Sequence, residues 1–456
     1  MSSEIMSENA SLEALAEYSS SALSETIPTK SRARVGQAIS DCLAVMVAGT
    51  TSEIAAALTS TYPPDGGSHY VMRVGNYESA ATAALVWGTL IHALDFDDAA
   101  IPAYTHPGSH LVAGLLAIAS EAMLTGEDLI RGYRVGLQIE NTLGELLNPS
   151  HYQAGWHATG TLGPIATTGA IIAALRVSKD VAINAFAISA SMAGGVRANF
   201  GTMTKPLHAG LAARAGVESV FLALGGYTGS PTAMDAKDGY FAAYRGSGEQ
   251  RSMSLEDLRR HEWAMTGNGL MLKLYPSCAA THTAIDAALE LRTLVNSDDQ
   301  IVSVEIGVCE FVTGVLRDTA PADGLQAKFS NEYCIAAALV RGEVTMESFS
   351  EIAFAEPAVQ ELAARMTMRV DPELANERIT QPTMLHATTS SGRVVEVVCR
   401  NAKGTGSRWP TLLEQQAKWR SCATWAGLSD LESRTLIEIL DALPTTLDAA
   451  ELIGRI

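Results

Sequence analysis

Three basic side chains occur where a helix is expected to begin, and such positions are suited to binding anions. His106 and Lys205 each directly precede a proline, the residue that is favoured at the first position of a helix. His157 directly precedes a further apolar stretch with helical spacing. Unpaired backbone N–H groups and the helix dipole favour negative charge at helix N-termini. If these three ends converge, we expect them to form a pocket for carboxylate groups.

Each of these bases also has a simpler explanation when it is taken alone. A histidine at the start of a helix often caps that helix or is hydrogen-bonded in the core, and Lys205 beside a proline could lie on the surface. The same setting occurs three times in one chain, which favours the functional interpretation.

An acidic cluster at residues 95–98 closes an apolar helix. With His106 and His110 nearby, such a cluster suggests a metal site. A proline and a glycine lie between the two histidines, however, so these need not share a helix face. Acids at a helix C-terminus oppose the dipole, so we prefer carboxylates that orient or charge the nearby histidines. We therefore expect no metal.

Two further motifs carry reactive side chains. Cys278 follows Lys273 and precedes a helix, a setting that can lower a thiol pKa and produce a base or nucleophile. A small buried thiol is an equally good explanation. Tyr333, at the start of another apolar helix, could supply a phenolic proton or simply pack.

The composition restricts the class of protein. The 456 residues carry a net charge of -18 with only 32 Lys and Arg, which argues against a nucleic-acid or membrane partner. Six scattered cysteines without a C-x-x-C motif favour a reducing compartment, and residues 1–15 do not resemble a secretory signal. We expect a cytoplasmic protein. The apolar stretch Ala158–Leu175 contains several glycines and threonines, which predicts a buried helix and not a membrane span.

The periodicity predicts a mainly α fold with two domains. Helical spacing dominates residues 1–267 and returns over 403–456, which together are expected to form an all-helical domain. Residues 268–402 are expected to form an inserted, smaller α+β domain. Within it, Gln300–Val315 alternates as a strand does, and three more strands are expected at Thr367–Val370, Met384–Thr388 and Arg393–Arg400.

Six motifs, in order and spacing, resemble the MmgE/PrpD family over about residues 30–430: HALDFDD, THPGSH, GWHATGTLG, TKPLHAG, KLYPSC and AKFSNEYCIAAALV. Known activities of that family include 2-methylcitrate dehydratase, cis-aconitate decarboxylase and iminodisuccinate epimerase. The resemblance implies a large helical domain, a smaller α+β domain, a homodimer and no required metal or organic cofactor. It also implies a small polycarboxylate substrate.

The resemblance also assigns expected roles to residues of these motifs. The expected catalytic residues are His106, His157, Lys205, Cys278 and Tyr333, and the expected substrate-binding residues are Asp95, Lys273 and His208.

Two departures from the family pattern bear on the reaction. Ala99 stands where decarboxylase-like members have threonine, and Cys278 stands where they have histidine. Both argue against decarboxylation. A thiol on one face and Lys205 or a histidine on the other resemble a two-base isomerase, so we expect epimerisation of iminodisuccinate first. The alternatives are dehydration of a 2-methylcitrate-type substrate and a carboxylate-binding protein without enzymatic activity.

Overall fold

The computed structural model describes residues 9–22, 27–249, 251–260, 265, 267–296, 298–316 and 320–455. The chain divides into two compact units, Met1–Met271 with Thr411–Ile456 and Leu272–Pro410. Over its described residues, the first unit is helical apart from one short pair of strands, and the second combines helices with a four-stranded sheet. The predicted fold class, a large helical domain with a smaller α+β domain, is confirmed.

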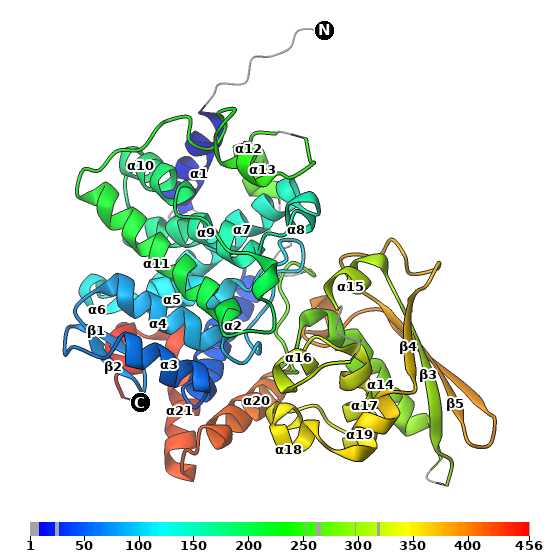
Figure 1. Cartoon of the computed structure of the whole chain (residues 1–456). Helices are drawn as coiled ribbons and strands as arrows, with labels where there is room; N and C mark the ends of the chain where they lie inside the picture. Colours follow the sequence, from blue (N-terminus) through cyan, green and yellow to red (C-terminus); the bar gives the residue numbers. More distant parts are fainter. Residues whose placement is uncertain are drawn as a thin grey trace, which may run out of the picture. The chain divides into compact units, whose positions relative to one another are not determined.

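The helical unit is formed by the two ends of the chain (Figure 1). Its N-terminal part contains α1 (Ala10–Ser21), α2 (Thr29–Gly49), α3 (Glu53–Thr61), β1 (His69–Val71), β2 (Gly75–Tyr77), α4 (Ala80–His92), α5 (Pro107–Ala117), α6 (Ala119–Ala122), α7 (Gly126–Leu147), α8 (Ser150–Gln153), α9 (Ala158–Leu175), α10 (Lys179–Ala190), α11 (Thr204–Leu224), α12 (Tyr240–Tyr244) and α13 (Leu255–Arg260). The C-terminal part returns as α20 (Leu412–Trp425), α21 (Asp430–Ala442) and α22 (Ala449–Ile453).

The centre of this unit is a tightly packed group of helices, in which α5 packs against α4, α7, α9 and α11. Small residues allow the close approach. A Cβ atom added to Gly210 of α11 would lie 2.2 Å from Thr89 Oγ1 and 2.3 Å from the Leu85 carbonyl oxygen, both of α4. Glycine is therefore required where α4 and α11 cross. This crossing brings the C-terminal end of α4 to the first turn of α11.

Two helices of this unit, α9 and α11, are long and apolar enough by length and composition to cross a membrane, and the bent pair α2–α3 would be a third. Within the structure, 94% of α9 and 61% of the apolar window of α11 are buried. The stretch Ala158–Leu175 therefore forms a core helix, as the sequence predicts.

The α+β unit is built on a sheet of order β4-β3-β5-β6. Its strands are β3 (Ile301–Val308), β4 (Met366–Val370), β5 (Thr383–Thr389) and β6 (Val394–Cys399), and its helices are α14 (His282–Leu294), α15 (Glu310–Val315), α16 (Gly324–Ala327), α17 (Asn331–Arg341), α18 (Glu351–Phe354) and α19 (Pro357–Ala363). Strand β3 pairs in parallel with β4 and antiparallel with β5, and β5 pairs antiparallel with β6. Helix α14 packs on β5 and β6 and also contacts α17.

One predicted strand in this unit is too long. The alternation over Gln300–Val315 suggests a single strand, but β3 ends at Val308 and residues 310–315 form α15. Cys309 adopts the extended N-cap conformation, and Glu310 follows in the first turn, where a negative charge suits the helix dipole. Apolar alternation alone does not reveal this change.

Candidate active site

An ion pair between Asp95 and Lys205 lies at the centre of the candidate site. Helix α4 ends at His92, and the next turn leads to Asp95, whose φ of +54° is in the left-handed region. The sequence predicts that α11 begins just after Lys205. In the structure α11 begins at Thr204, so Lys205 is the second residue of the helix. Its Nζ is 3.0 Å from Asp95 Oδ2, and the two side chains are 6% and 8% exposed. The site therefore contains a buried ammonium group, shielded little by solvent.

His106 is held in one orientation beside this pair. It is the N-cap residue of α5, as the sequence predicts, and its Nδ1 donates to the Asp98 carbonyl oxygen at 3.0 Å. A neutral His106 must then carry its proton on Nδ1 and its lone pair on Nε2. Nε2 lies 3.9 Å from Asp95 Oδ1. In its neutral form, His106 therefore presents Nε2 as the proton acceptor.

His157 and His208 form a second pair, with 2.8 Å between their Nδ1 atoms. His157 is the N-cap residue of α9, and His208 lies one turn into α11, beyond Lys205. When both rings are neutral, one Nδ1 donates and the other accepts, so the rings are opposite tautomers. Burial and the Lys205 ammonium lower the pKa of His157 well below its usual value, and both causes also lower the pKa of His208. The pair is therefore neutral at pH 7.

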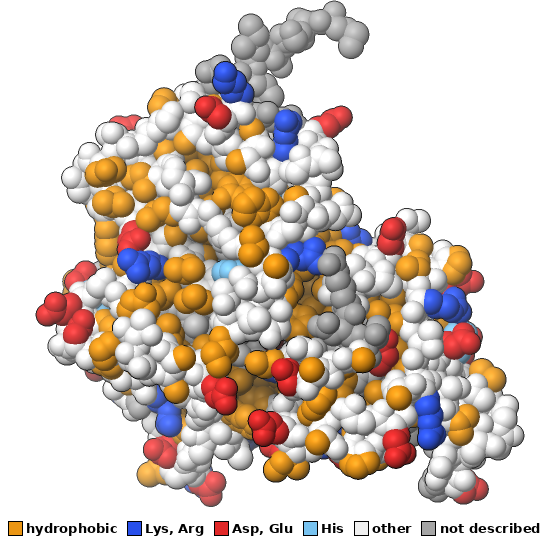
Figure 2. Space-filling view, in the orientation of Figure 1, with side chains coloured by type: hydrophobic (Ala, Val, Ile, Leu, Met, Phe, Trp, Pro, Cys, Tyr) orange, Lys and Arg blue, Asp and Glu red, His pale blue; other side chains and the backbone are white. Residues whose placement is uncertain are grey.

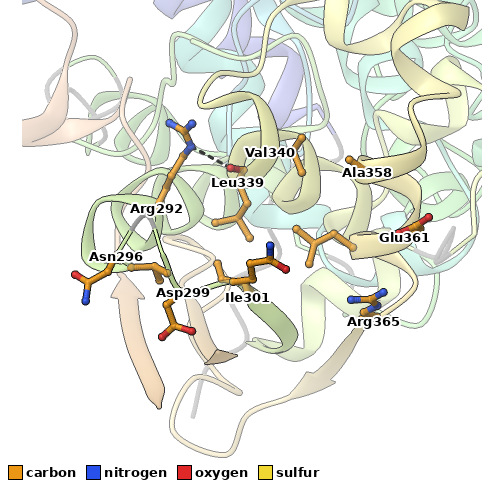
Figure 3. A pocket seen from close by; sticks show the side chains of 12 residues that line it. Arg292, Asn296, Asp299, Ile301, Leu339, Val340, Ala358, Glu361 and Arg365 are labelled. Atoms are coloured by element: carbon orange, nitrogen blue, oxygen red, sulfur yellow. Dashed lines mark hydrogen bonds between the residues drawn. The ribbon is translucent and has the colours of Figure 1, made fainter. Parts of the chain in front are cut away.

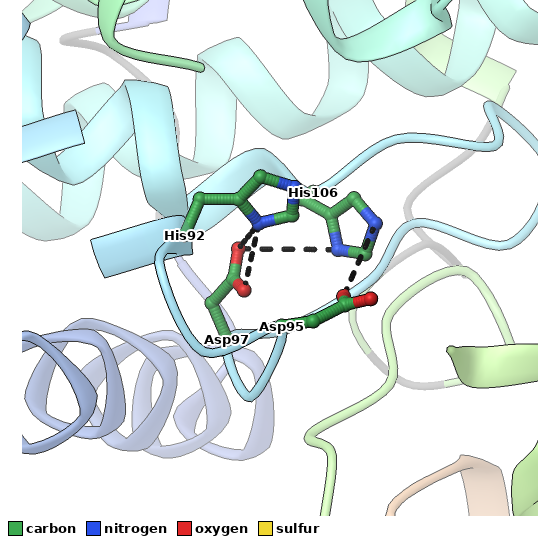
Figure 4. Close-up of side chains that lie close together, drawn as sticks. All are labelled: His92, Asp95, Asp97 and His106. Carbon is green, nitrogen blue, oxygen red and sulfur yellow. Dashed lines mark hydrogen bonds and ion pairs between the residues drawn. The ribbon is translucent and has the colours of Figure 1, made fainter. Parts of the chain in front are cut away.

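Behind these groups lies a histidine–carboxylate pair that the sequence analysis does not single out (Figure 4). His92 Nδ1 lies 2.9 Å and 3.0 Å from the two carboxylate oxygens of Asp97, and both side chains are fully buried. The His92 ring centre is 4.4 Å from that of His106 and 6.4 Å from that of His157. His92 opens the HALDFDD motif, three residues before Asp95, and this proximity is the signal that could have identified it.

Asp98 fixes the start of α5 from the other side. Its carboxylate accepts the Gly108 N–H at 2.7 Å and the Tyr133 hydroxyl, and burial raises its pKa to about 8. Asp97 thus contacts His92 as an orienting carboxylate would, whereas Asp98 contacts His106 through its backbone carbonyl group. His110, in contrast, is bound to Glu140 and Thr167 inside the core, each at 2.9 Å.

Three other predicted residues belong to the α+β unit. Lys273 is fully buried there, and the Cys278 backbone N–H donates to the Lys328 carbonyl oxygen at 3.0 Å. The Tyr333 hydroxyl donates to the Ser348 carbonyl oxygen, and burial raises its pKa to about 12. The phenolic proton of Tyr333 is thus already used by the main chain, which is unfavourable for a proton donor in catalysis.

A cavity of about 640 Å³ in the α+β unit does not coincide with any of these groups (Figure 3). It is lined by the end of α14, the start of β3 and parts of α17 and α19, with Arg292, Asp299, Glu361 and Arg365 among its side chains. No predicted site residue lines it. Because proton-transfer chemistry requires the clustered histidines and lysine, we place the candidate site in the helical unit and not at this cavity.

Four side chains of the site could supply ligands to a metal ion. His92, Asp95, Asp97 and His106 each offer one ligand atom, and these atoms lie within 4.8 Å of one another. Such a set suits a divalent cation. However, Lys205 is already paired with Asp95, and His92 Nδ1 with Asp97. An ion would have to displace the ammonium or a ring proton, which favours a site that works without a metal.

Comparison with known proteins agrees with the order of the motifs. The MmgE/PrpD N-terminal domain matches residues 13–252, and the MmgE/PrpD C-terminal domain matches residues 275–442. The human cis-aconitate decarboxylase is 28% identical over 302 residues, which cover 64% of this chain and 62% of the human protein. The chain thus spans less than two thirds of that relative.

Two fungal relatives are matched over a longer stretch. A cis-aconitate decarboxylase-like protein of Aspergillus oryzae is 26% identical over 430 residues, 89% of this chain and 88% of the relative. A cis-aconitate decarboxylase of Aspergillus terreus is 25% identical over 379 residues, 77% of this chain and 76% of the relative. The two matched domains together cover most of the sequence, and the chain therefore belongs to the MmgE/PrpD family.

Proposed function

We propose that this protein is an enzyme that transfers a proton at the carbon next to a carboxylate of a small di- or tricarboxylate, without a metal or organic cofactor. The observation that carries the proposal is the neutral His157–His208 pair, in which His208 lies on α11 one turn beyond Lys205, the cation of the buried Lys205–Asp95 ion pair. One cluster thus offers a base that is ready to accept a proton and a cation that can hold or protonate an anion.

The chemistry follows from the charges of these groups. Removing a proton or CO₂ beside a carboxylate places negative charge on carbon, and a fixed ammonium group stabilises that charge. The His157–His208 pair provides a neutral proton acceptor. The hydrogen bond of His106 Nδ1 to the Asp98 carbonyl group makes Nε2 the acceptor atom of a neutral His106. The net charge of the protein is -18, so a polycarboxylate must be attracted by this local group and not by the overall field.

Within this class we place epimerisation of iminodisuccinate first. An epimerase needs one group to remove a proton and another to return it on the opposite face, and it needs no leaving group. In this proposal a neutral His157 removes the proton and a protonated Lys205 returns one. The substitutions Ala99 and Cys278 support the same choice, because both depart from the decarboxylase pattern.

Decarboxylation of cis-aconitate is the second candidate, because the human and fungal relatives carry that name. The same ammonium and imidazole groups would bind the tricarboxylate and protonate the carbon after CO₂ has left. Dehydration of 2-methylcitrate requires in addition an acid for the departing hydroxyl group, a role open to Lys205 or to a protonated histidine.

Proton NMR in D₂O with iminodisuccinate, 2-methylcitrate and cis-aconitate distinguishes these reactions. We expect deuterium to enter iminodisuccinate beside a carboxylate, with loss of stereochemical purity and without release of water or CO₂. Itaconate-type alkene signals from cis-aconitate would instead assign decarboxylation, and alkene signals from 2-methylcitrate would assign dehydration. No change in any of the three compounds would contradict the proposed substrate class.

The pH profile should reflect the lowered pKa of His157. The base must be neutral, and burial and Lys205 keep it neutral below the usual histidine value of 6.5. We therefore expect kcat/KM to remain constant as the pH falls through 6.5 and to decline only at lower pH. The measurement is kcat/KM against pH, over a range in which circular dichroism shows a folded protein. A half-maximal rate at or above pH 6.5 would mean that the essential base is not the buried His157.

Chelation should leave the activity unchanged. Because Lys205 and His92 already pair with the carboxylates of the site, we expect protein treated with EDTA and then desalted to retain its full rate. The same sample should contain far less than one equivalent of zinc, iron or manganese by elemental analysis. Activity that is lost with EDTA and recovered with one of these ions would refute the cofactor-independent mechanism.

We further propose that the chain forms a homodimer through α11 and the segment after it. Hydrophobic side chains are exposed over this part of the helical unit (Figure 2), including Leu211, Leu222, Leu224 and Tyr227, which are 39–65% exposed. Such a cluster, on one helix and just beyond its end, is typical of an interface with a second copy. Light scattering should give a mass of about twice the 48.1 kDa of one chain. The double change Leu222→Glu with Leu224→Glu should reduce the measured mass to that of a single chain.

A further inference from the structure

The loop that presents Asp95, residues 95–99, is held at every position by a different part of the helical unit. Its contacts are Asp95 with Lys205 of α11, Phe96 with Lys418 of α20, Asp97 with His92 of α4, Asp98 with Gly108 of α5 and Tyr133 of α7, and Ala99 with Met271. Five of these six contacts come from helices or segments that precede residue 272. The contact to Phe96 comes from the C-terminal part of the chain.

Lys418 makes this C-terminal contact with three interactions. Its Nζ donates to the Phe96 carbonyl oxygen at 2.8 Å, lies 2.6 Å from Asp41 Oδ2 of α2, and lies 4.0 Å from the centre of the Phe96 ring. The Lys418 and Asp41 side chains are only 4% and 1% exposed. A single buried ammonium group therefore joins α20, α2 and the loop.

The position of this contact in the loop matters. Asp95, the residue before Phe96, has the left-handed backbone conformation that non-glycine residues rarely adopt. Such a conformation persists only where the surroundings hold it. Helix α4 precedes Asp95 in the chain, and Lys418 binds the carbonyl group of Phe96, the residue that follows Asp95. Lys418 therefore restrains the backbone on the C-terminal side of Asp95. The direction of the Asp95 carboxylate toward Lys205 and His106 depends on that backbone.

We propose that Lys418 is a positioning residue for the active site: by binding the Phe96 carbonyl group it holds Asp95 against Lys205 and His106. The proposal deepens the proposed function and rests on it only for the expected loss of rate. It also gives the C-terminal segment a role in the site, since α20 otherwise lies outside the motifs that identify the candidate residues.

A simpler possibility is that Lys418 only neutralises Asp41. The double change Asp41→Asn with Lys418→Met separates the two roles, because it removes both charges and leaves no unpaired buried carboxylate. The matched control is Gln415→Met. Gln415 lies one turn earlier on α20, is buried, and donates to the Gln37 carbonyl oxygen of α2 at 2.6 Å, so it joins α20 and α2 without contacting the loop.

The readout is the set of ring-nitrogen NMR signals of His106 in protein with ¹⁵N-labelled histidine, identified by their loss in His106→Asn. The charged and titratable groups around His106 are Asp95 and Asp97 of the loop, His92 of α4, His157 of α9 and Lys205 of α11. Spectra are compared at one pH. The thermal unfolding midpoint and, with the substrate found by NMR, kcat and KM are measured for the same samples.

We expect the double variant to move the His106 signals from the Nδ1–H tautomer toward a mixture, because the Asp98 carbonyl group shifts with the loop. We also expect kcat/KM to fall about 10²-fold, as for other small displacements of reacting groups. Gln415→Met should lower the unfolding midpoint but change neither the His106 signals nor kcat/KM. If the double variant does not fold, Asp41→Asn with Lys418→Leu takes its place with the same expectation.

Unchanged His106 signals in a folded double variant would overturn the proposal, whatever the rate. So would signals that move equally in Asp41→Asn alone, because that change keeps the Lys418 contact with Phe96. If the wild-type protein converts none of the three substrates, the proposed function fails, while the His106 spectra still decide whether Lys418 holds the loop.

Discussion

Replacing Lys205 with methionine is expected to lower kcat/KM by about 10³-fold or more, since losing one buried charge-stabilising group typically costs 10²–10³-fold and losing an acid adds to it. The change also leaves the Asp95 carboxylate buried without the cation that lies 3.0 Å away. Breaking such a pair on one side typically costs about 3–5 kcal/mol of stability. A loss of activity in the single variant could therefore reflect unfolding.

The double change Asp95→Asn with Lys205→Met removes this ambiguity. It replaces the ion pair by two neutral side chains of similar size, so the unfolding free energy should recover most of what the single change loses. The rate should not recover, because the cation is still absent. A double variant that regains both stability and rate would show that Lys205 has only a structural role. Lys179→Met, which removes a half-exposed lysine paired with Glu13 and Glu17, is the surface control and should change neither quantity.

The positions of the helix-start bases were predictable from local sequence. His106 and His157 are N-cap residues, and Lys205 lies in the first turn of its helix. Proline and apolar periodicity carry this information, because both act within a few residues. The sheet strands β4, β5 and β6 were predicted for the same reason, from short alternating runs that end at turn residues.

Other parts of the site depend on contacts between distant residues, which a local pattern does not contain. Lys418 lies 322 residues from Phe96, and nothing in the sequence of α20 distinguishes it from a surface lysine. His92 and Asp97 are close in sequence, but their pairing depends on the turn that Asp95 makes with its left-handed backbone. The order of the motifs in the sequence indicated the family, whereas the orientation of each side chain came only from the fold.

Replacing His157 with glutamine is expected to lower the turnover rate by about 10²–10⁴-fold while leaving substrate binding nearly intact. Burial and Lys205 lower the pKa of His157, so this ring is neutral at pH 7 and does not attract a carboxylate by charge. Glutamine is also neutral and can keep a hydrogen bond to His208, so the dissociation constant should change little. It cannot accept a proton from carbon, and losing a general base costs about 10²–10⁴-fold in rate.

Calorimetric titration with the substrate or a non-reacting dicarboxylate, together with the rate by NMR, tests this expectation. The matched control is His151→Gln, because His151 is a buried histidine of the same unit that binds the Tyr244 carbonyl group and Thr161 and lies outside the cluster. The control should bind and turn over like the wild type. A carboxylate-binding protein without activity would show the same affinity in His157→Gln and no turnover in either form. An affinity that falls in proportion to the rate would instead make His157 a binding group, and the base would then have to be His106, whose Nε2 faces Asp95.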